Sequence, residues 1–275
     1  MKRLRLLSKD KFAVIAVVVL FLLVLVALFA PIISPGNPIH SVGAPIQPPS
    51  EAHWFGTDQM GRDVFSMVVW GSRVSLTFAL GAAGVSLVIG VILGALSGYI
   101  GGVFDDILSR IFEIFYVIPV TFLIILMVAI FGSNISLMVV VVGLTIWPTN
   151  ARIMRAQVLS LKNRTYVHAA DVAGSSKMKI LFSHIVPNGI GPILTNSMLQ
   201  MAQAVLIEAS LSFLGLGDPS LASWGKILQS GQSHISSAPW LVIIPGIVIA
   251  VMLLSFNLFA NALERNFDVK QRIYD

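Results

Sequence analysis

"FAVIAVVVLFLLVLVALFAPII", residues 12–33, is a long run without a charged side chain. A helix needs roughly 20 mainly apolar residues to cross a bilayer, so this run is long enough to be a membrane span. A signal peptide also begins with positive charges, but its apolar centre is only roughly 7 to 15 residues long. We therefore interpret residues 12–33 as a retained span. It is preceded by five cations: Lys2, Arg3, Arg5, Lys9 and Lys11.

The composition of the whole chain agrees with a membrane protein. Of its 275 residues, 56% are hydrophobic and 11% are charged, whereas about 25% are charged in a soluble domain. The mean hydropathy is +0.87. Because lipid leaves only helices or closed barrels with their backbone groups paired, we predict an all-α bundle of six membrane-spanning helices. The other five spans are expected at residues 74–98, 111–131, 135–149, 189–214 and 240–263.

The distribution of positive charge predicts the orientation of the chain. An even number of spans places both termini on one side of the membrane. If that side is the cytoplasm, only Arg62, Arg73 and Lys226 of the 18 lysines and arginines lie outside. Cytoplasmic segments carry such an excess, so we expect both termini in the cytoplasm. This bias accounts for the net charge of +5, and we predict no nucleic-acid partner.

Several kinds of chemistry are missing from the sequence. The chain has no cysteine, and it lacks the G-x-x-x-x-G-K-[ST] loop that holds nucleotide phosphates. It also lacks the H-E-x-x-H spacing of a metal site and the G-x-S-x-G turn of a hydrolase. We predict that the chain is not an enzyme and binds no cofactor or metal itself. Glu208 is the chief carboxylate within a predicted span, so energy for transport is expected to come through another chain.

Two features of the predicted spans have alternative interpretations. Gly90, Gly94, Gly98 and Gly102 recur every four residues, which favours a close helix contact, either within this chain or with another subunit. Glu208 contacts a solute on its path, or it is a hydrogen-bonded carboxylate near the membrane surface.

The expected external segment, residues 34–73, is rich in proline at its start. At its end, apolar residues recur at helical spacing and predict a short amphipathic helix at the membrane surface. These residues are Val64, Phe65, Val68 and Val69. The alternative is a packed loop anchored by Trp54 and Trp70.

About forty residues, 150–189, separate the fourth and fifth predicted spans. We expect a short helix over residues 164–173, with Ala169, Ala170 and Ala173 close together and Gly174 ending it in a left-handed conformation. A second helix is expected from Ser175 to Pro187, where the chain turns into the membrane. A helix with small side chains on one face can enter a groove of another protein. The alternative is a helix bound to anionic lipid by Arg164, Lys177 and Lys179.

The segment resembles the cytoplasmic EAA loop of ABC importer permeases, whose pattern is E-A-A-x3-G-x9-I-x-L-P. The matching residues are His168, Ala169, Ala170, Gly174, Val186 and Pro187. The branch resembled is the dipeptide, oligopeptide and nickel group, in its second (C-type) permease subunit. Further matching blocks are FGTDQMGRD (55–63), GSRVSL (71–76), LSFLGLG (211–217), PWLVIIPG (239–246) and FNL (256–258). His168 departs from the pattern because it replaces the EAA glutamate.

The resemblance implies a type I ABC importer permease in a bacterial inner membrane. Its implied partners are a second homologous permease, two cytoplasmic ATPase subunits that bind ATP and Mg, and an extracytoplasmic solute-binding protein. The implied ATPase-coupling residues are Tyr166, Val167, His168, Ala169, Ala170, Asp171, Ala173, Gly174 and Pro187. The expected binding-protein docking residues are Asp58, Arg62 and Asp63.

The expected organisation is an N-terminal part, residues 1–73, and a permease core, residues 74–275, that includes the coupling loop 150–189. The expected solute is a di- or oligopeptide, and nickel or a metal chelate is the alternative. An ion-coupled secondary transporter and a membrane scaffold without transport are hypotheses from other classes.

Overall fold

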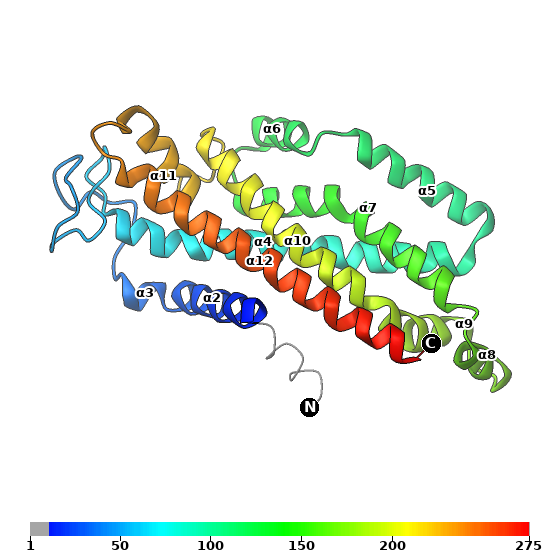
Figure 1. Ribbon diagram of the computed structural model, residues 1–275. Helices are drawn as coiled ribbons and strands as arrows, with labels where there is room; N and C mark the ends of the chain where they lie inside the picture. Colours follow the sequence, from blue (N-terminus) through cyan, green and yellow to red (C-terminus); the bar gives the residue numbers. More distant parts are fainter. Residues whose placement is uncertain (1–10, 275) are drawn as a thin grey trace.

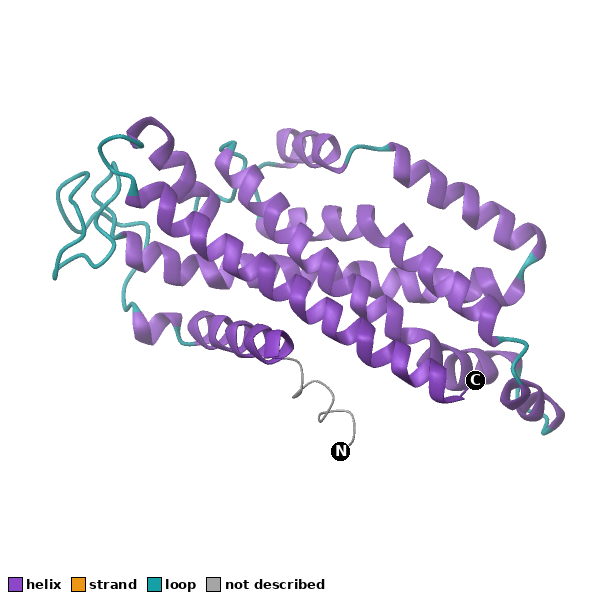
Figure 2. Cartoon of the chain, viewed as in Figure 1, coloured by secondary structure: helices purple, strands orange, loops and turns teal. Residues whose placement is uncertain are grey.

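The computed structural model describes residues 11–274, and the side chains of residues 11–267, as a bundle of long helices (Figure 1). Figure 2 shows helices and loops and no strand in this part of the chain. The helices are α2 (Lys11–Leu28), α3 (Ala30–Ile33), α4 (Val64–Ile100), α5 (Gly102–Val117), α6 (Val120–Phe131), α7 (Ile135–Leu161), α8 (Thr165–Val172), α9 (Lys177–Lys179), the π-helix η1 (Ile180–Ile185), α10 (Val186–Phe213), α11 (Trp224–Gly231), the 3-10 helix η2 (Gln232–His234) and α12 (Trp240–Tyr274).

The predicted spans correspond to long apolar helices. Five helical segments are long and apolar enough to cross a membrane: Lys11–Leu28, Val64–Ile100, Ile135–Leu161, Lys177–Phe213 and Trp240–Phe267. The pair α5 and α6 passes the same test but is bent by 77°, and it makes a sixth span if it is counted as one. The all-α membrane bundle is therefore confirmed. Of the basic N-terminal residues, Lys2, Arg3, Arg5 and Lys9 lie outside the described residues.

The third span is not the single helix predicted over residues 111–131. α5 ends at Val117, the backbone of Ile118 is extended with ψ 119°, and α6 begins after Pro119. Proline lacks the N–H that would continue the helix and disfavours a helical conformation in the residue before it. The prediction of one straight helix was wrong because it overlooked this proline.

The separate amphipathic helix predicted near residues 64–69 was also wrong. These residues form the start of α4, which continues without interruption to Ile100. Val64 and Val68 are buried against other parts of the chain. Gly71 lies so close to Trp224 that an added Cβ would be 2.6 Å from its Cδ1 atom. The proposed division at residue 73 falls inside this helix.

The glycines of α4 pack against α7. An added Cβ would lie 2.5 Å from the Cβ atom of Asn150 at Gly90, and 2.8 Å from the carbonyl oxygen of Arg155 at Gly98. At Gly94 it would meet the carbonyl oxygen of Ala151. The predicted helix contact is thus confirmed within this chain, because only glycine lets the two backbones approach so closely. Gly102 does not share this face, since it lies beyond the end of α4 with φ +57°.

A buried set of amides and hydroxyls links three helices near their middles. The side-chain amide of Asn150 on α7 donates to Ser86 on α4 at 3.1 Å and to the Gln200 oxygen on α10 at 2.9 Å. Gln200 donates to the Ile146 carbonyl at 2.9 Å, and Asn196 donates to Asn150 at 2.8 Å. Such bonds contribute about 0.6 kcal/mol each within a membrane. They fix α4, α7 and α10 in one register.

The chain does not turn at Pro187 as predicted. α9, η1 and α10 form a continuous helical segment from Lys177 to Phe213. Pro187 stands in the first turn of α10, directly after the π-helical turn of residues 180–185. A wide turn of this kind accommodates a residue that has no N–H to donate.

Candidate functional site

α8 is a short helix at the end of the bundle opposite the loop of residues 34–63 (Figure 1). Its C-terminus has the hydrogen-bond pattern of a Schellman motif, because Ser175 N donates to Ala170 O at 3.1 Å and Gly174 N donates to Asp171 O at 2.9 Å. Gly174 has φ +77°, which strains any other residue. The predicted helix and its glycine end are confirmed.

One face of α8 anchors it to the bundle. Val167 is buried and belongs to a cluster with Ile180, Leu181 and Ile185 of η1, and Ala170 packs against the same cluster. The expected grouping of three alanines is therefore divided between two faces. Ala170 is half-buried and faces this chain, whereas Ala169 and Ala173 are exposed.

The outer face of α8 is small and partly apolar. Val172 is 90% exposed, and Tyr166 is exposed on the same helix. Partial burial raises the pKa of the Tyr166 hydroxyl, although the charge of Arg164 and a hydrogen bond with Asn188 oppose this effect. An added Cβ on Gly174 would meet nothing within 4 Å. Val172 and Gly174 are thus uncovered, whereas Tyr166 contacts Asn188 of α10.

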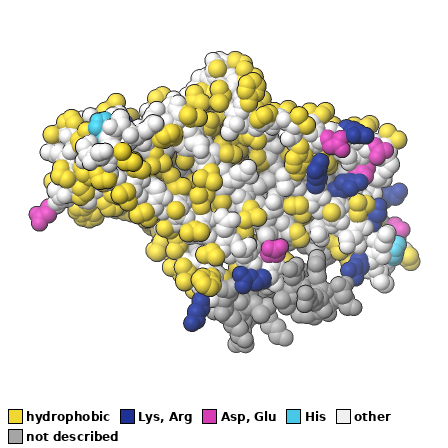
Figure 3. Space-filling model, turned by 45° about the horizontal axis from the view of Figure 1, so that its top comes forward, with side chains coloured by type: hydrophobic (Ala, Val, Ile, Leu, Met, Phe, Trp, Pro, Cys, Tyr) yellow, Lys and Arg dark blue, Asp and Glu magenta, His cyan; other side chains and the backbone are white. Residues whose placement is uncertain are grey.

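Polar and charged residues surround this small face. His168 and Asp171 on α8 are exposed, as are Lys177 and Lys179 on α9. In Figure 3, charged side chains gather at the right-hand end of the molecule, whereas hydrophobic side chains cover much of the rest of the visible surface. Pro187 is exposed, and it lies in α10 rather than on α8.

α8 is held between two long helices that reach the other end of the molecule. α7 leads into it, and the continuous segment Lys177–Phe213 leads away from it. At about 1.5 Å per residue that segment is roughly 55 Å long. The buried amides of Asn150 and Gln200 join the same two helices.

Glu208 lies near the far end of this segment. It is 4% exposed and accepts hydrogen bonds from Ser75 on α4 at 3.1 Å and from Ser212 at 2.8 Å. The cavity beside it has a volume of about 10 Å³, which is too small for a solute. Glu208 is therefore enclosed by α4, α7, α10 and the loop that leads into α11.

The three expected docking residues shape the loop of residues 34–63 and the start of α4. Asp58 is fully buried and accepts hydrogen bonds from the backbone of Arg62 at 2.9 Å and from its Nε at 2.6 Å. Asp63 begins α4 by accepting from Ser66 N at 2.8 Å, and it contacts His53 at 3.1 Å. Asp58 therefore offers no surface to a partner.

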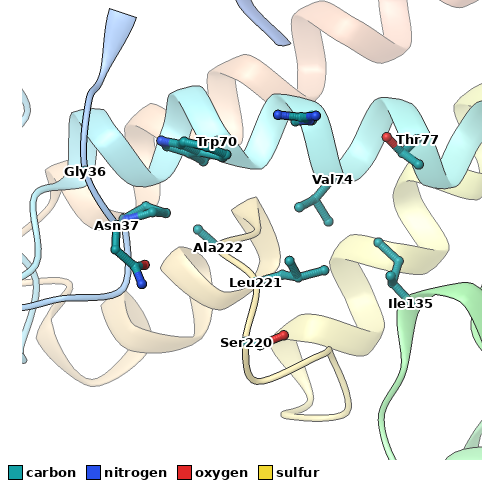
Figure 4. A pocket seen from close by; sticks show the side chains of 11 residues that line it. Gly36, Asn37, Trp70, Val74, Thr77, Ile135, Ser220, Leu221 and Ala222 are labelled. Atoms are coloured by element: carbon teal, nitrogen blue, oxygen red, sulfur yellow. The ribbon is translucent and has the colours of Figure 1, made fainter. Parts of the chain in front are cut away.

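A pocket lies at the end of the bundle that carries the loop of residues 34–63, which we call the loop end, and it was not predicted from the sequence. Its volume is about 540 Å³, and its walls come from α4, the start of α7 and two loops (Figure 4). Trp70, Arg73 and Thr77 line it from one face of α4. Their spacing of three and four residues along the helix was the available signal. The opposing wall, from the loop that leads into α11, could not be inferred from sequence.

Residues 90–271 match the family described as the binding-protein-dependent transport system inner membrane component. The chain belongs to this family. Residues 3–49 match a second family, the N-terminal transmembrane domain of oligopeptide transport permease C. The match of residues 90–271 contains α8 and both helices that hold it. α8 therefore lies within the part of the chain that matches the family.

Similar proteins cover nearly the whole chain. The oligopeptide transport system permease protein OppC of Bacillus subtilis is 37% identical over 96% of this chain and 87% of its own length. The dipeptide transport system permease protein DppC of Alkalihalophilus pseudofirmus is 35% identical over 97% of this chain and 88% of its own length. The glutathione transport system permease protein GsiD of Pectobacterium atrosepticum is 38% identical over 81% and 74%, respectively.

Proposed function

We propose that this chain forms half of the translocation path of an ATP-driven peptide importer, and that α8 couples it to the ATPases. The observation that carries this proposal is the small outer face of α8, which is held rigidly while its neighbours in the chain leave it uncovered. A short helix of this shape fits a groove on another protein. Tyr166, Ala169 and Ala173 form the contact surface, and Val167 and Ala170 hold the helix in place.

The mechanism follows from the rigid connection of α8. Two cytoplasmic ATPase subunits bind ATP and Mg and move toward each other, and each coupling helix follows the groove in which it sits. α7 and α10 then move with α4 as one body, because Asn150, Ser86 and Gln200 fix their register. This rocking opens the path to one side of the membrane at a time. A second, homologous permease forms the other half.

The orientation of the chain follows from the same proposal. The α8 end and both termini face the cytoplasm, so the loop end faces outward and meets the loaded binding protein. The excess of lysine and arginine in the cytoplasmic segments supports this orientation.

The proposed solutes are di- and oligopeptides. This choice rests on the similar permeases, which are named for oligopeptide, dipeptide and glutathione transport. Nickel and metal chelates, the alternative raised by the sequence, have no counterpart in those names. Among the residues that the structure describes, no group of three or more histidines, aspartates and glutamates is placed to hold a metal ion.

The proposal is tested by copurifying the tagged chain with its partners and reconstituting the complex in liposomes. We expect ATP hydrolysis to rise when a peptide-loaded binding protein is added outside, and labelled peptide to accumulate inside. If nickel stimulated ATP hydrolysis and peptide did not, nickel rather than peptide would be the solute. Ion-driven flux through the purified chain without ATPase subunits would contradict the importer and favour a secondary transporter.

A further inference from the structure

The pocket at the loop end has walls of mixed character. Trp70, Val74 and Thr77 lie along α4, opposite Leu221 and Ser220 of the loop leading into α11 (Figure 4). Ile135 closes one side, and the loop after α3 closes another. At about 540 Å³ the pocket is within the range of about 300 to 1,000 Å³ that is typical of small-molecule sites.

Arg73 is the charged residue of this pocket, and its charge has no acidic partner. It is exposed, and its guanidinium stacks over the Trp70 ring with 5.9 Å to the ring centroid. No ion pair joins it to a carboxylate in the part of the chain that the structure describes. An arginine held beside apolar walls is suited to bind a carboxylate with two parallel hydrogen bonds.

The two carboxylates behind the pocket wall are engaged elsewhere. Glu208 accepts from Ser75 and Ser212. Asp218 accepts from the backbone and the hydroxyl of Ser220 at 3.0 and 2.6 Å, and the Lys226 ammonium donates to the backbone carbonyl of Asp218. The residues that line the pocket thus include the cation Arg73 and no carboxylate.

We propose that this pocket receives the C-terminal carboxylate of a peptide at the outer end of the path, with Arg73 as the contact residue. This inference rests on the proposed function. The hydroxyl of Thr77 lies one helical turn from Arg73 and supplies a further donor. The apolar walls, including Val74 and Leu221, accommodate the last side chain of the peptide without demanding one residue type.

Arg73 stands beside a tryptophan near the membrane surface, where an arginine also meets lipid phosphate. The walls favour the peptide because they consist of external loops on two sides. If Arg73 binds the peptide carboxylate, removing that carboxylate from the solute and removing Arg73 lower uptake through the same lost contact, so the two changes together lower uptake by less than the product of their separate effects. If Arg73 binds a lipid phosphate, the two effects are independent.

The experiment uses the reconstituted complex with its binding protein and compares uptake of a labelled tripeptide with uptake of its C-terminal amide. In the unchanged complex we expect the acid to be favoured, partly by the binding protein. In Arg73→Gln the ratio of acid to amide uptake should fall by roughly tenfold, as expected when a charge-assisted pair that is partly exposed to water is lost. Arg73→Lys keeps the charge but loses the two-pronged geometry, so its ratio should fall by about two- to threefold.

Arg110→Gln is the matched control, since Arg110 is an exposed cation on α5, and its ratio should not change. An unchanged ratio in both Arg73 variants would overturn the inference. An equal loss for acid and amide that depends on the phosphatidylglycerol content of the liposomes would also overturn it, in favour of lipid. If Arg73→Gln does not copurify with its partners, Arg73→Lys decides alone. Absence of uptake of either peptide by the unchanged complex would contradict the proposed function itself.

Discussion

Small residues at two places in this chain have opposite surroundings. On α4, Gly90, Gly94 and Gly98 face the α7 backbone so closely that no Cβ fits. On and after α8, Ala169 and Ala173 are exposed, and a Cβ on Gly174 meets nothing. The same kind of residue at helical spacing therefore serves two purposes. On α4 the small residues let two helices pack closely, and on α8 they leave a surface that the rest of the described chain does not cover.

The largest effect is expected where the small residue is enclosed. Gly94→Leu places a side chain against the carbonyl oxygen of Ala151, and backbone cannot move aside easily. We expect a loss of about 3 kcal/mol of unfolding free energy, the upper end of the usual range for overpacking. Thermal unfolding in detergent, followed by size-exclusion chromatography, measures it. Gly84→Leu on the same helix is the control, because a Cβ added to Gly84 would meet no other described part of the chain within 4 Å. Equal stability of the Gly94 and Gly84 variants would show that close packing of Gly94 against α7 does not stabilise the bundle.

A bulky residue on the outer face of α8 should leave folding intact and stop transport. Ala169→Trp removes no contact with this chain, since Ala169 is exposed. We expect uptake to fall by roughly tenfold or more, as when a contact at the centre of an interface is blocked. Liposome uptake and copurified ATPase are the measurements, and Ser160→Trp, also exposed, is the control. Normal coupling in the Ala169 variant would show that this face contacts no ATPase.

The two regions also differ in how far the sequence could predict them. α8 and its glycine end depend on nearby residues, so alanines followed by Gly174 were sufficient. Asp58 looked like an exposed loop residue, but its burial depends on how the loop folds around Arg62. Local sequence does not contain that information. α5 ends before Pro119, whereas Pro187 lies in the first turn of α10 and follows a π-helical turn that its own residue type does not indicate.

Glu208 belongs to the enclosed region, and its substitution should have an intermediate effect. Glu208→Gln keeps the size of the side chain and one oxygen for Ser75 or Ser212. We expect the amount of folded protein to be unchanged, because the amide oxygen still accepts from Ser75 or Ser212. We expect uptake to fall by about threefold, because a neutral amide makes weaker hydrogen bonds to a solute than a carboxylate does. Uptake and detergent-soluble yield are measured together. Normal uptake would exclude Glu208 from the path, and a large loss of yield would make its role structural.

The smallest effect is expected from the lysines next to α8. Lys177→Gln combined with Lys179→Gln removes two exposed charges but leaves the small face unchanged. If α8 contacts a protein groove, uptake should change by less than about twofold, as is usual for charges at the rim of an interface. If α8 instead lies on anionic lipid, this double variant should be worse than Ala169→Trp, since each lysine contributes about 1 kcal/mol there. Uptake by both variants in the same liposomes decides between these readings.

The contact of α8 with an ATPase subunit is the central claim, and cross-linking tests it most directly. The chain has no cysteine, so Ala173→Cys provides a single site for a photoreactive maleimide in the assembled complex. We predict a cross-linked product that contains this chain and an ATPase subunit, with a yield that changes when ATP is bound. Ser233→Cys, exposed at the loop end, should give no such product. Labelling of lipid alone from position 173 would contradict the claim.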